Sequence, residues 1–399
     1  MESLNLEQKK YKDENVVEQF NINGSVLEYS KNTFPFKVNS FPREYVVSTI
    51  DNLEDYIELV SQSDFIIIDK NIESLYQLPL DIKAYIFRIT ATESEKNLDT
   101  VVELINKLID QNISKGSNLI SIGGGIIQDI SAAACALFRR GQPFIYLPTT
   151  TLGQLDSCVG AKCALNTQKA KNIIGLFSAP KQVIIPIFMI NSMPLSDHRA
   201  GLSEMLRLCL TASKNALHNY LNLLDNILDP QTISLDCYKK ALRLSLSIKK
   251  SVVDFDEYEK DVRRSMNYGH TFGHAIEKLV EFKIPHGIGV LLGIHMSNTF
   301  AYNKKLMNRT TYSEISIAIQ KTVNKINNDF TYLTQLQAET IIEQFKFDKK
   351  GDGISVPLIM IKEPGNMIFY QYKFESNDQI LIESIQLAIN NFVKWTKEK

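Results

Sequence analysis

Short apolar runs, separated by stretches with helical spacing, fill the first half of the chain. Between residues 95 and 114, apolar residues recur at the spacing of a helix that buries one face. Five other runs have the length and composition of buried strands: 64–69, 84–89, 117–122, 144–147 and 183–185. Strands that alternate with helices are typical of βαβ units. This half therefore predicts an α/β domain with a parallel sheet.

The pattern changes after Pro194. From residue 197 to about residue 346 the apolar positions keep helical spacing, and few glycines occur outside 269–293. Residues 354–361 and 367–371 predict a β-hairpin, and residues 378–397 predict a final helix. The second half of the chain is therefore expected to be mainly helical.

Two further segments lack helical spacing. Residues 18–50 alternate as strands do, with turn residues between the alternating stretches, and residues 156–172 are loop-like and rich in basic and amide groups. With the changes of pattern described above, we expect an N-terminal extension, a parallel-sheet domain and a helical domain, at 1–42, 43–194 and 195–399.

Composition narrows the possible partners and the compartment. The 399 residues include 44 basic and 45 acidic side chains, so the net charge of −1 favours neither nucleic acid nor a membrane surface as a partner. No apolar run reaches transmembrane length, and the first residues have no apolar core of signal-peptide length. The five cysteines are odd in number and form no CxxC pair, which favours reduced thiols in a cytoplasmic protein over cysteine catalysis.

Histidines gather in one stretch. Three of the six histidines, His270, His274 and His286, fall within residues 270–286. His270 and His274 share one face if this segment is helical. His286 follows after a proline. Imidazole is the commonest ligand for zinc-type metals, and a catalytic site needs about three protein ligands and an open position. The alternative is a pair of structural histidines on an ordinary helix. The acidic ligand that such a site lacks is best supplied by Glu204, at the start of the helical half, although 45 carboxylates compete for this role.

Three consecutive glycines, 123–125, follow the run 117–122 and precede a helix of small residues. Without Cβ atoms the backbone can approach a pyrophosphate, and the helix N-terminus supplies free N–H groups. A tight strand-to-helix turn would also use glycine without any ligand. The GxGxxG dinucleotide fingerprint is absent.

Several blocks in this order and spacing are more specific than any one of them alone. They are Gly123 to Asp129, Pro148 to Thr150, Asp156 with Lys162 and Asn166, Lys171 with Asn172, Arg199 to Glu204, and Asn267 to Gly287, which contains His270, His274 and His286. Through these blocks the chain, from about residue 64 to 360, resembles the 3-dehydroquinate synthase family of sugar-phosphate cyclases.

The resemblance implies an N-terminal Rossmann-like NAD-binding domain, an all-α C-terminal metal-binding domain and an active site in the cleft between them. The implied reaction converts a phosphorylated keto sugar, 3-deoxy-D-arabino-heptulosonate 7-phosphate, into 3-dehydroquinate and phosphate. The implied cofactors are NAD and Zn²⁺ or Co²⁺, and the implied assembly is a homodimer.

Residue by residue, the matching positions imply a complete site. Glu204, His270 and His286 look like the metal ligands, and His274 looks like the catalytic histidine beside them. The positions similar to substrate contacts are Lys162, Lys171, Asn172, Lys249, Arg263, Asn267, Arg140 from the neighbouring subunit, and Lys349 or Lys350. The positions similar to NAD contacts are Asp69, Asn71, Glu93, Lys96, Gly124, Gly125, Asp129, Thr149, Thr150 and Asp156.

The chain departs from the family pattern close to this site. Ile288 stands where the family usually has glutamate, two residues after His286. Arg207, which we include among the expected catalytic residues, replaces a lysine and keeps its charge but not its shape. Gln128 and Ala161 each stand where the family often has glycine.

Three alternatives to a 3-dehydroquinate synthase stay open at this point. A related cyclase of secondary metabolism or glycan synthesis would act on another sugar phosphate. A metal-dependent polyol dehydrogenase would produce NADH, and the Lys and Arg positions similar to phosphate and carboxylate contacts argue against it. A catalytically silent nucleotide-binding relative is supported only by the changes at 207 and 288, and the intact glutamate and histidines argue against it.

Overall fold

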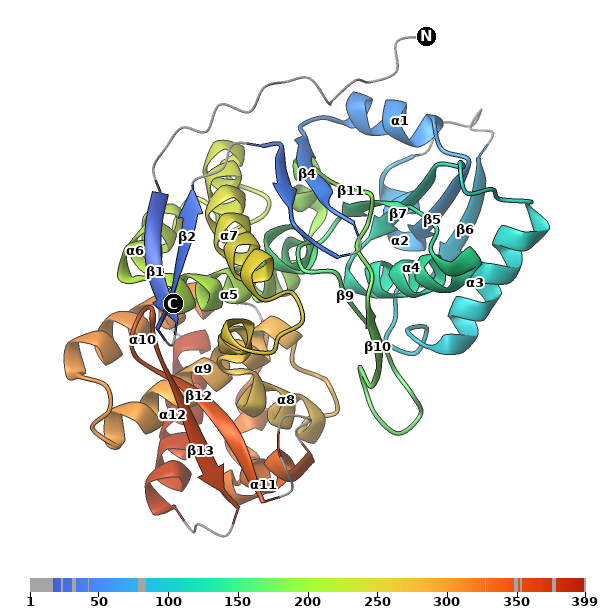
Figure 1. Cartoon of the computed structure of the whole chain (residues 1–399). Helices are drawn as coiled ribbons and strands as arrows, with labels where there is room; N and C mark the ends of the chain where they lie inside the picture. Colours follow the sequence, from blue (N-terminus) through green and yellow to red (C-terminus); the bar gives the residue numbers. More distant parts are fainter. Residues whose placement is uncertain are drawn as a thin grey trace.

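The structure is a computed structural model that describes residues 17–22, 24–30, 34–41, 43–77, 84–326, 328–347, 351, 354–374 and 378–397. The chain forms a sheet half, drawn mainly in blue to green, and a helical half, drawn mainly in yellow-green to red (Figure 1). Within the described ranges, no helix is long and apolar enough to cross a membrane.

A seven-stranded sheet forms the centre of the first half, in the order β3-β4-β11-β8-β7-β5-β6. β3 is antiparallel to β4, and every other neighbouring pair is parallel. The strands are β3 (Phe36–Val38), β4 (Tyr45–Ile50), β5 (Phe65–Asp69), β6 (Tyr85–Ile89), β7 (Leu119–Gly123), β8 (Ile145–Pro148) and β11 (Gln182–Pro186). The parallel α/β sheet and the five strands expected from apolar runs are confirmed.

Helices cover both faces of this sheet because its central strands are apolar on both sides. In β5, Ile66 and Ile68 pack in one core cluster with Tyr56, whereas Ile67 packs in the other with Leu104. Tyr56 lies in α1 and Leu104 in α3, on opposite faces. The covering helices are α1 (Leu53–Ser61), α2 (Lys70–Leu75), α3 (Leu98–Asp110) and α4 (Gly125–Leu137).

The second half is mainly helical, as expected. The helices are α5 (Leu195–Ala212), α6 (Lys214–Leu224), α7 (Leu235–Phe255), α8 (His270–Leu279), α9 (His286–Asn303), α10 (Arg309–Val323), α11 (Ala338–Gln344) and α12 (Gln379–Lys397). The predicted hairpin is confirmed as β12 (Ser355–Glu363) and β13 (Asn366–Lys373), and α12 is the predicted final helix. Helix α9 is buried along most of its length, with α5, α8 and α12 packed around it.

Two short hairpins lie outside the main sheet. β1 (Val17–Ile22) and β2 (Ser25–Ser30) pack against α7 and α5, so this hairpin lies on the helical half (Figure 1). β9 (Lys162–Leu165) and β10 (Ile174–Phe177) form the second hairpin. The prediction of a loop across 156–172 was wrong for β9, because its four residues pair only with β10 and show too short an alternation to be recognised.

His295 is an exception to the apolar core around α9. Its side chain is fully buried beside the Trp395 ring, with 4.6 Å between ring centroids, and neither ring nitrogen has a hydrogen-bond partner among the described residues. Burial lowers the pKa of His295 to about 3. The folded protein therefore keeps this imidazole neutral.

We predict that His295 weakens the fold in acid. The unfolded chain takes up a proton at this position below the ordinary histidine pKa of about 6.5. The folded chain does not take up this proton until about pH 3. His295 therefore costs no stability above about pH 6.5. Below that pH it lowers the free energy of unfolding by up to about 1.4 kcal/mol per pH unit. Melting curves from pH 7.5 to 5 should show a shallower acid slope for His295→Leu than for the wild type. Equal slopes would contradict this assignment.

Candidate active site

Helices α8 and α9 cross so closely that only glycine fits at the contact. A Cβ added at Gly293 would lie 2.0 Å from the carbonyl oxygen of Gly269, and one at Gly273 would lie 3.0 Å from the backbone of Val290. Gly269 also has a φ of +81°, which glycine adopts without strain, and it caps α8. This crossing places the first residues of α8 beside His286, the first residue of α9.

Three histidines meet at this crossing. One ring nitrogen from each of His270, His274 and His286 lies within 4.8 Å of the others. The ring centroids of His270 and His274 are 5.3 Å apart, and those of His270 and His286 are 5.5 Å apart. Two nitrogens on one zinc ion lie at most about 4.2 Å apart, because Zn–N distances are about 2.0–2.1 Å. The cluster therefore needs only small side-chain movements to hold a single ion.

Glu204 of α5 faces the same cluster. Its Oε1 atom lies 3.5 Å from Nε2 of His286 and 4.0 Å from Nε2 of His270. This oxygen is buried and has no hydrogen-bond partner among the described residues. A buried carboxylate oxygen without a partner is costly, and a cation at this point would satisfy it. The donor set therefore fits a divalent metal of the zinc type.

Close helix contacts also hold α5 in place. A Cβ on Gly287 would lie 2.0 Å from the carbonyl oxygen of Ala200, and a Cβ on Gly201 would lie 2.6 Å from the backbone nitrogen of Leu152. The first contact joins α5 to α9, and the second joins α5 to the sheet half. Glu204 therefore reaches the histidines from a helix that touches both.

Glu277 is a nearby residue that the sequence interpretation missed. Its Oε1 accepts a hydrogen bond from Nδ1 of His286 at 2.9 Å. Burial alone would lower the pKa of His286, but the carboxylates of Glu277 and Glu204 raise it to about 9. Helical spacing could have identified Glu277, because it lies three residues after His274 and seven after His270.

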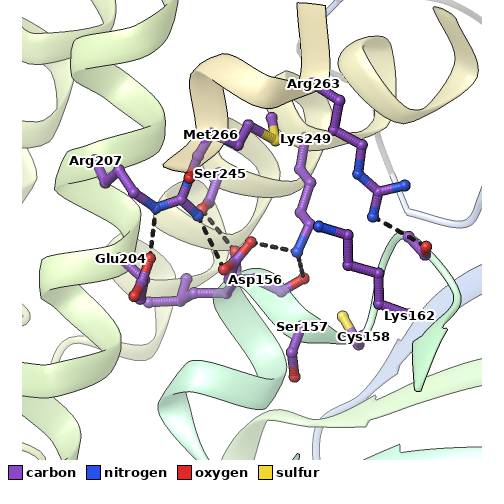
Figure 2. A network of polar contacts seen from close by, with 12 residues as sticks. Asp156, Ser157, Cys158, Lys162, Glu204, Arg207, Ser245, Lys249, Arg263 and Met266 are labelled. Atoms are coloured by element: carbon purple, nitrogen blue, oxygen red, sulfur yellow. Dashed lines mark hydrogen bonds and ion pairs between the residues drawn. The ribbon is translucent and has the colours of Figure 1, made fainter. Parts of the chain in front are cut away.

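A network of buried charges extends from the histidine cluster toward the sheet half (Figure 2). Arg207 donates from Nε to Oε2 of Glu204 at 2.5 Å and from Nη2 to Asp156 at 3.1 Å. Its Nη1 donates to the carbonyl oxygen of Met266 at 2.7 Å. Lys249 pairs with the same carboxylate of Asp156. Burial alone would raise the pKa of Asp156, but Lys249 and Arg207 hold it below its usual range.

Lys162 and Asn267 meet at a second carboxylate that sequence analysis missed. Both donate to Glu259, one to each carboxylate oxygen. Burial lowers the pKa of Lys162 to about 8, although the charge of Glu259 opposes the shift. Arg263, beside them, donates to the carbonyl oxygen of Gly160 at 3.0 Å. No periodic pattern marked Glu259, because it lies in the irregular segment between α7 and α8.

The glycine turn has the form expected of a pyrophosphate site. β7 ends at Gly123 and α4 begins at Gly125, with no side chain capping its first N–H groups. A Cβ on Gly125 would meet no atom within 4 Å, so the space above this residue is open. The helix N-terminus and the open space fit a phosphate of a dinucleotide such as NAD.

Polar groups expected to contact NAD pair with one another and with the loop of the β9–β10 hairpin. Lys96 pairs with Asp129 at 2.6 Å and donates to Asn172 at 2.7 Å. Glu93 pairs with Lys171 at 3.4 Å. The structure therefore joins residues expected to bind NAD to two expected to bind substrate, through the β9–β10 hairpin.

Four other expected NAD contacts lie where parallel strands of the sheet end. Asp69 ends β5 and accepts a hydrogen bond from the backbone of Asn71 at 3.0 Å. Thr149 and Thr150 follow β8, and the buried hydroxyl of Thr149 has no hydrogen-bond partner among the described residues. Ligands of open parallel sheets bind at this edge, beyond the carboxyl ends of the strands.

The remaining expected site residues are not joined to this arrangement. Arg140 is exposed on a turn after α4 and has a φ of 61°. Lys349 and Lys350 lie outside the described residues. The roles of the individual site residues stay predictions.

Two of the departures from the family pattern have a structural account. Gln128 exchanges two hydrogen bonds with Ser157, both of 2.9 Å, and so ties α4 to the turn that carries Asp156. Ile288 is fully buried in the core cluster beside the histidines.

Comparison with known proteins is consistent along most of the chain. Residues 86–200 match the family model described as 3-dehydroquinate synthase N-terminal, and residues 201–351 match the one described as 3-dehydroquinate synthase C-terminal. The 3-dehydroquinate synthase of Pelagibacter ubique is 31% identical over 365 residues, which cover 86% of this chain and 96% of that protein. The enzyme of the same name from Thermoanaerobacter pseudethanolicus is 30% identical, covering 84% and 94%.

Solved structures of two synthases share the fold. A 2-deoxy-scyllo-inosose synthase, in complex with carbaglucose-6-phosphate, NAD⁺ and Co²⁺, has a TM-score of 0.74 at 21% identity, covering 88% of this chain and 99% of that one. The 2-epi-5-epi-valiolone synthase of Streptomyces hygroscopicus, with NAD⁺ and Zn²⁺ bound, has a TM-score of 0.72 at 20% identity, covering 89% and 99%. With two family models that together span residues 86–351 and relatives at 30% identity or more, the chain belongs to the 3-dehydroquinate synthase family.

Proposed function

We propose that this protein is an NAD- and divalent-metal-dependent cyclase that converts 3-deoxy-D-arabino-heptulosonate 7-phosphate into 3-dehydroquinate and phosphate. Relatives of this name align with most of the chain. The observation that carries the proposal is the unpartnered, buried Oε1 of Glu204, which faces His270 and His286 of the three-histidine cluster at the edge of a buried charge network. The proposed site joins the sheet half, which offers the NAD turn, to the helical half.

The residues present fit both proposed cofactors. Glu204, His270 and His286 would hold Zn²⁺ or Co²⁺, and the turn at Gly124 and Gly125 would hold the NAD pyrophosphate. When bound, the metal would polarise a substrate oxygen and NAD⁺ would accept and then return a hydride. The protein contributes position and charge complementarity to this chemistry.

Cationic side chains suit a substrate that carries both a phosphate and a carboxylate. Lys162 is half exposed and has a pKa of about 8, so it can donate hydrogen bonds to an anion near neutral pH. Lys249 and Arg263, the positions associated with a substrate carboxylate, lie near Lys162 in the same network (Figure 2). Two separate anionic groups on one substrate therefore have cationic partners, which a neutral polyol would not require.

His274 has a different proposed role from the other two histidines. Its ring stacks on that of His286 with centroids 5.6 Å apart, within the same cluster. We assign it proton transfer to and from substrate oxygens, since Glu204, His270 and His286 already supply three ligands and leave one position open.

The proposed assembly is a cytoplasmic homodimer. Arg140 is exposed at the end of the turn after α4. In the family pattern the matching arginine reaches the phosphate site of the neighbouring subunit. This position therefore supports a site completed by a second copy of the chain.

A related cyclase acting on another sugar phosphate is the second candidate. Arg207 lies in the network around Glu204 and Ile288 lies beside it, and both differ from the family pattern. The structural neighbours include a 2-deoxy-scyllo-inosose synthase and a 2-epi-5-epi-valiolone synthase. Arg207 donates hydrogen bonds from three nitrogens to acceptors within the protein, so the positive charge at this position is used inside the protein.

The proposed reaction is tested by phosphate release from 3-deoxy-D-arabino-heptulosonate 7-phosphate, with NAD⁺ and Zn²⁺ or Co²⁺ added and the organic product identified. We expect phosphate and 3-dehydroquinate in equal amounts, and loss of both when a chelator removes the metal. No release by folded, metal-loaded protein would exclude this substrate and favour the second candidate.

We predict that His270→Ala loses metal and activity together. Removing one of three ligands leaves too few donors for a stable site, so metal content measured after dialysis should fall well below one equivalent. His218→Ala, which changes an exposed histidine on α6, is the matched control and should keep both. An active, metal-free His270→Ala protein would exclude His270 as a ligand.

We expect His274→Ala to separate metal binding from activity. This variant should keep about one equivalent of metal, while turnover falls by about 10²–10⁴-fold, the usual contribution of a general acid or base. Metal content and turnover rate are measured on the same preparation. Loss of metal would instead make His274 a ligand.

A further inference from the structure

Glu277 contacts the proposed metal ligand His286 at Nδ1, the ring nitrogen that does not face Glu204. It lies in α8, on the same helical face as His270 and His274, and its side chain is buried. Its Oε1 lies 2.9 Å from Nδ1 of His286. A carboxylate accepts hydrogen bonds, so Nδ1 of His286 carries the proton in this contact.

This hydrogen bond decides which atom of His286 is available to a cation. When Nδ1 bears the hydrogen, the neutral ring has its lone pair on Nε2. Nε2 is the atom that lies 3.5 Å from the unpartnered Oε1 of Glu204. The two carboxylates therefore bracket one imidazole: Glu277 accepts from one nitrogen, and Glu204 faces the other.

The surrounding backbone leaves room for Glu277 and for little else. A Cβ added at Gly289 would lie 3.1 Å from Oε1 and 3.2 Å from Cγ of Glu277, so a side chain at 289 would press on the carboxylate. Ile288 beside it is apolar and fully buried, so the position where the family usually has glutamate supplies no charge here. Within the described residues, Glu277 is the carboxylate recorded at Nδ1 of His286.

We propose that Glu277 is a positioning residue of the metal site, which fixes the ring orientation and the Nδ1–H form of His286 so that Nε2 binds the metal. The inference rests on the metal-binding part of the proposed function, but not on the identity of the sugar phosphate. Carboxylates behind ligating histidines fix the tautomer and increase ligand basicity, and their loss typically lowers metal affinity about 10- to 100-fold.

A purely structural role makes a different prediction. If Glu277 only satisfied a buried donor, its replacement would change stability and leave the metal affinity of the folded protein unchanged. Glutamine has the same shape and can still accept one hydrogen bond, so Glu277→Gln removes the charge with little change in packing. Metal affinity is therefore the property that separates the two roles.

The test measures Co²⁺ and Zn²⁺ affinity by competition with a chelator, for the wild type, Glu277→Gln, Gly289→Ala and Glu281→Gln. We expect about 10- to 100-fold weaker binding for Glu277→Gln, and weaker binding for Gly289→Ala, which keeps the carboxylate but displaces it. Glu281→Gln changes an exposed carboxylate just beyond the same helix and should bind as the wild type does. The visible spectrum of bound Co²⁺ should also change in Glu277→Gln, because the ligand geometry changes.

Wild-type affinity and an unchanged Co²⁺ spectrum in a folded Glu277→Gln protein would overturn the inference while leaving the proposed function intact. Weaker metal binding in this variant, together with a wild type that releases no phosphate from the proposed substrate, would support the inference and exclude the function. A wild type that binds neither metal would overturn both, and melting temperatures of the metal-free proteins show whether each variant is folded.

Discussion

The close crossing of α8 and α9 is the constraint on which the rest of the site depends. Gly269 and Gly293 bring the two backbones into contact, so that His270 and His274 lie beside His286. A methyl group at Gly293 would separate the helices, because it would overlap a backbone oxygen that cannot move aside. Glycine usually weakens a helix, by about 1 kcal/mol relative to alanine. Here that cost is offset by a helix contact that only glycine allows.

Buried charge then links the histidine cluster to the other half of the molecule. Asp156 comes from the sheet half, whereas Arg207, Glu204 and Lys249 come from helices of the second half. Removing one partner from a buried ion pair typically costs about 3–5 kcal/mol, because the remaining charge is left without compensation. A further contact joins the halves where Lys171 lies 3.3 Å from the centroid of the Phe282 ring. The two halves are therefore held in register at the place where the proposed cofactors would meet.

Some of this could be predicted from sequence because the signal was local. Fully apolar runs gave the central strands, and the spacing of His270 and His274 placed them on one helical face. Glu204 was named from its place at the start of the helical half and from the family resemblance, because no local pattern separates it from the other carboxylates and α5 reaches the histidines only through tertiary contacts. Glu259 lies in an irregular segment without such a signal and was missed. Glu277 was within reach of sequence analysis, because its spacing from the histidines repeats the helical period.

The departures from the family pattern act within this framework. Arg207 donates hydrogen bonds to three acceptors within the protein, and Ile288 is fully buried in the apolar core. Both changes therefore alter the surroundings of the proposed metal ligands without removing a ligand. The proposed chemistry is a closed redox cycle, in which NAD, when bound, would take a hydride from the substrate and return it within the same turnover. A dehydrogenase with the same fold would release the reduced cofactor instead.

The most direct test of this account is the number of phosphate ions released per NAD⁺ when NAD⁺ is limiting and the substrate is 3-deoxy-D-arabino-heptulosonate 7-phosphate. We expect many phosphate ions per NAD⁺, with 3-dehydroquinate as the product and no accumulation of NADH. Accumulation of NADH in proportion to the substrate consumed would contradict it, because the protein would then be a dehydrogenase and not a cyclase.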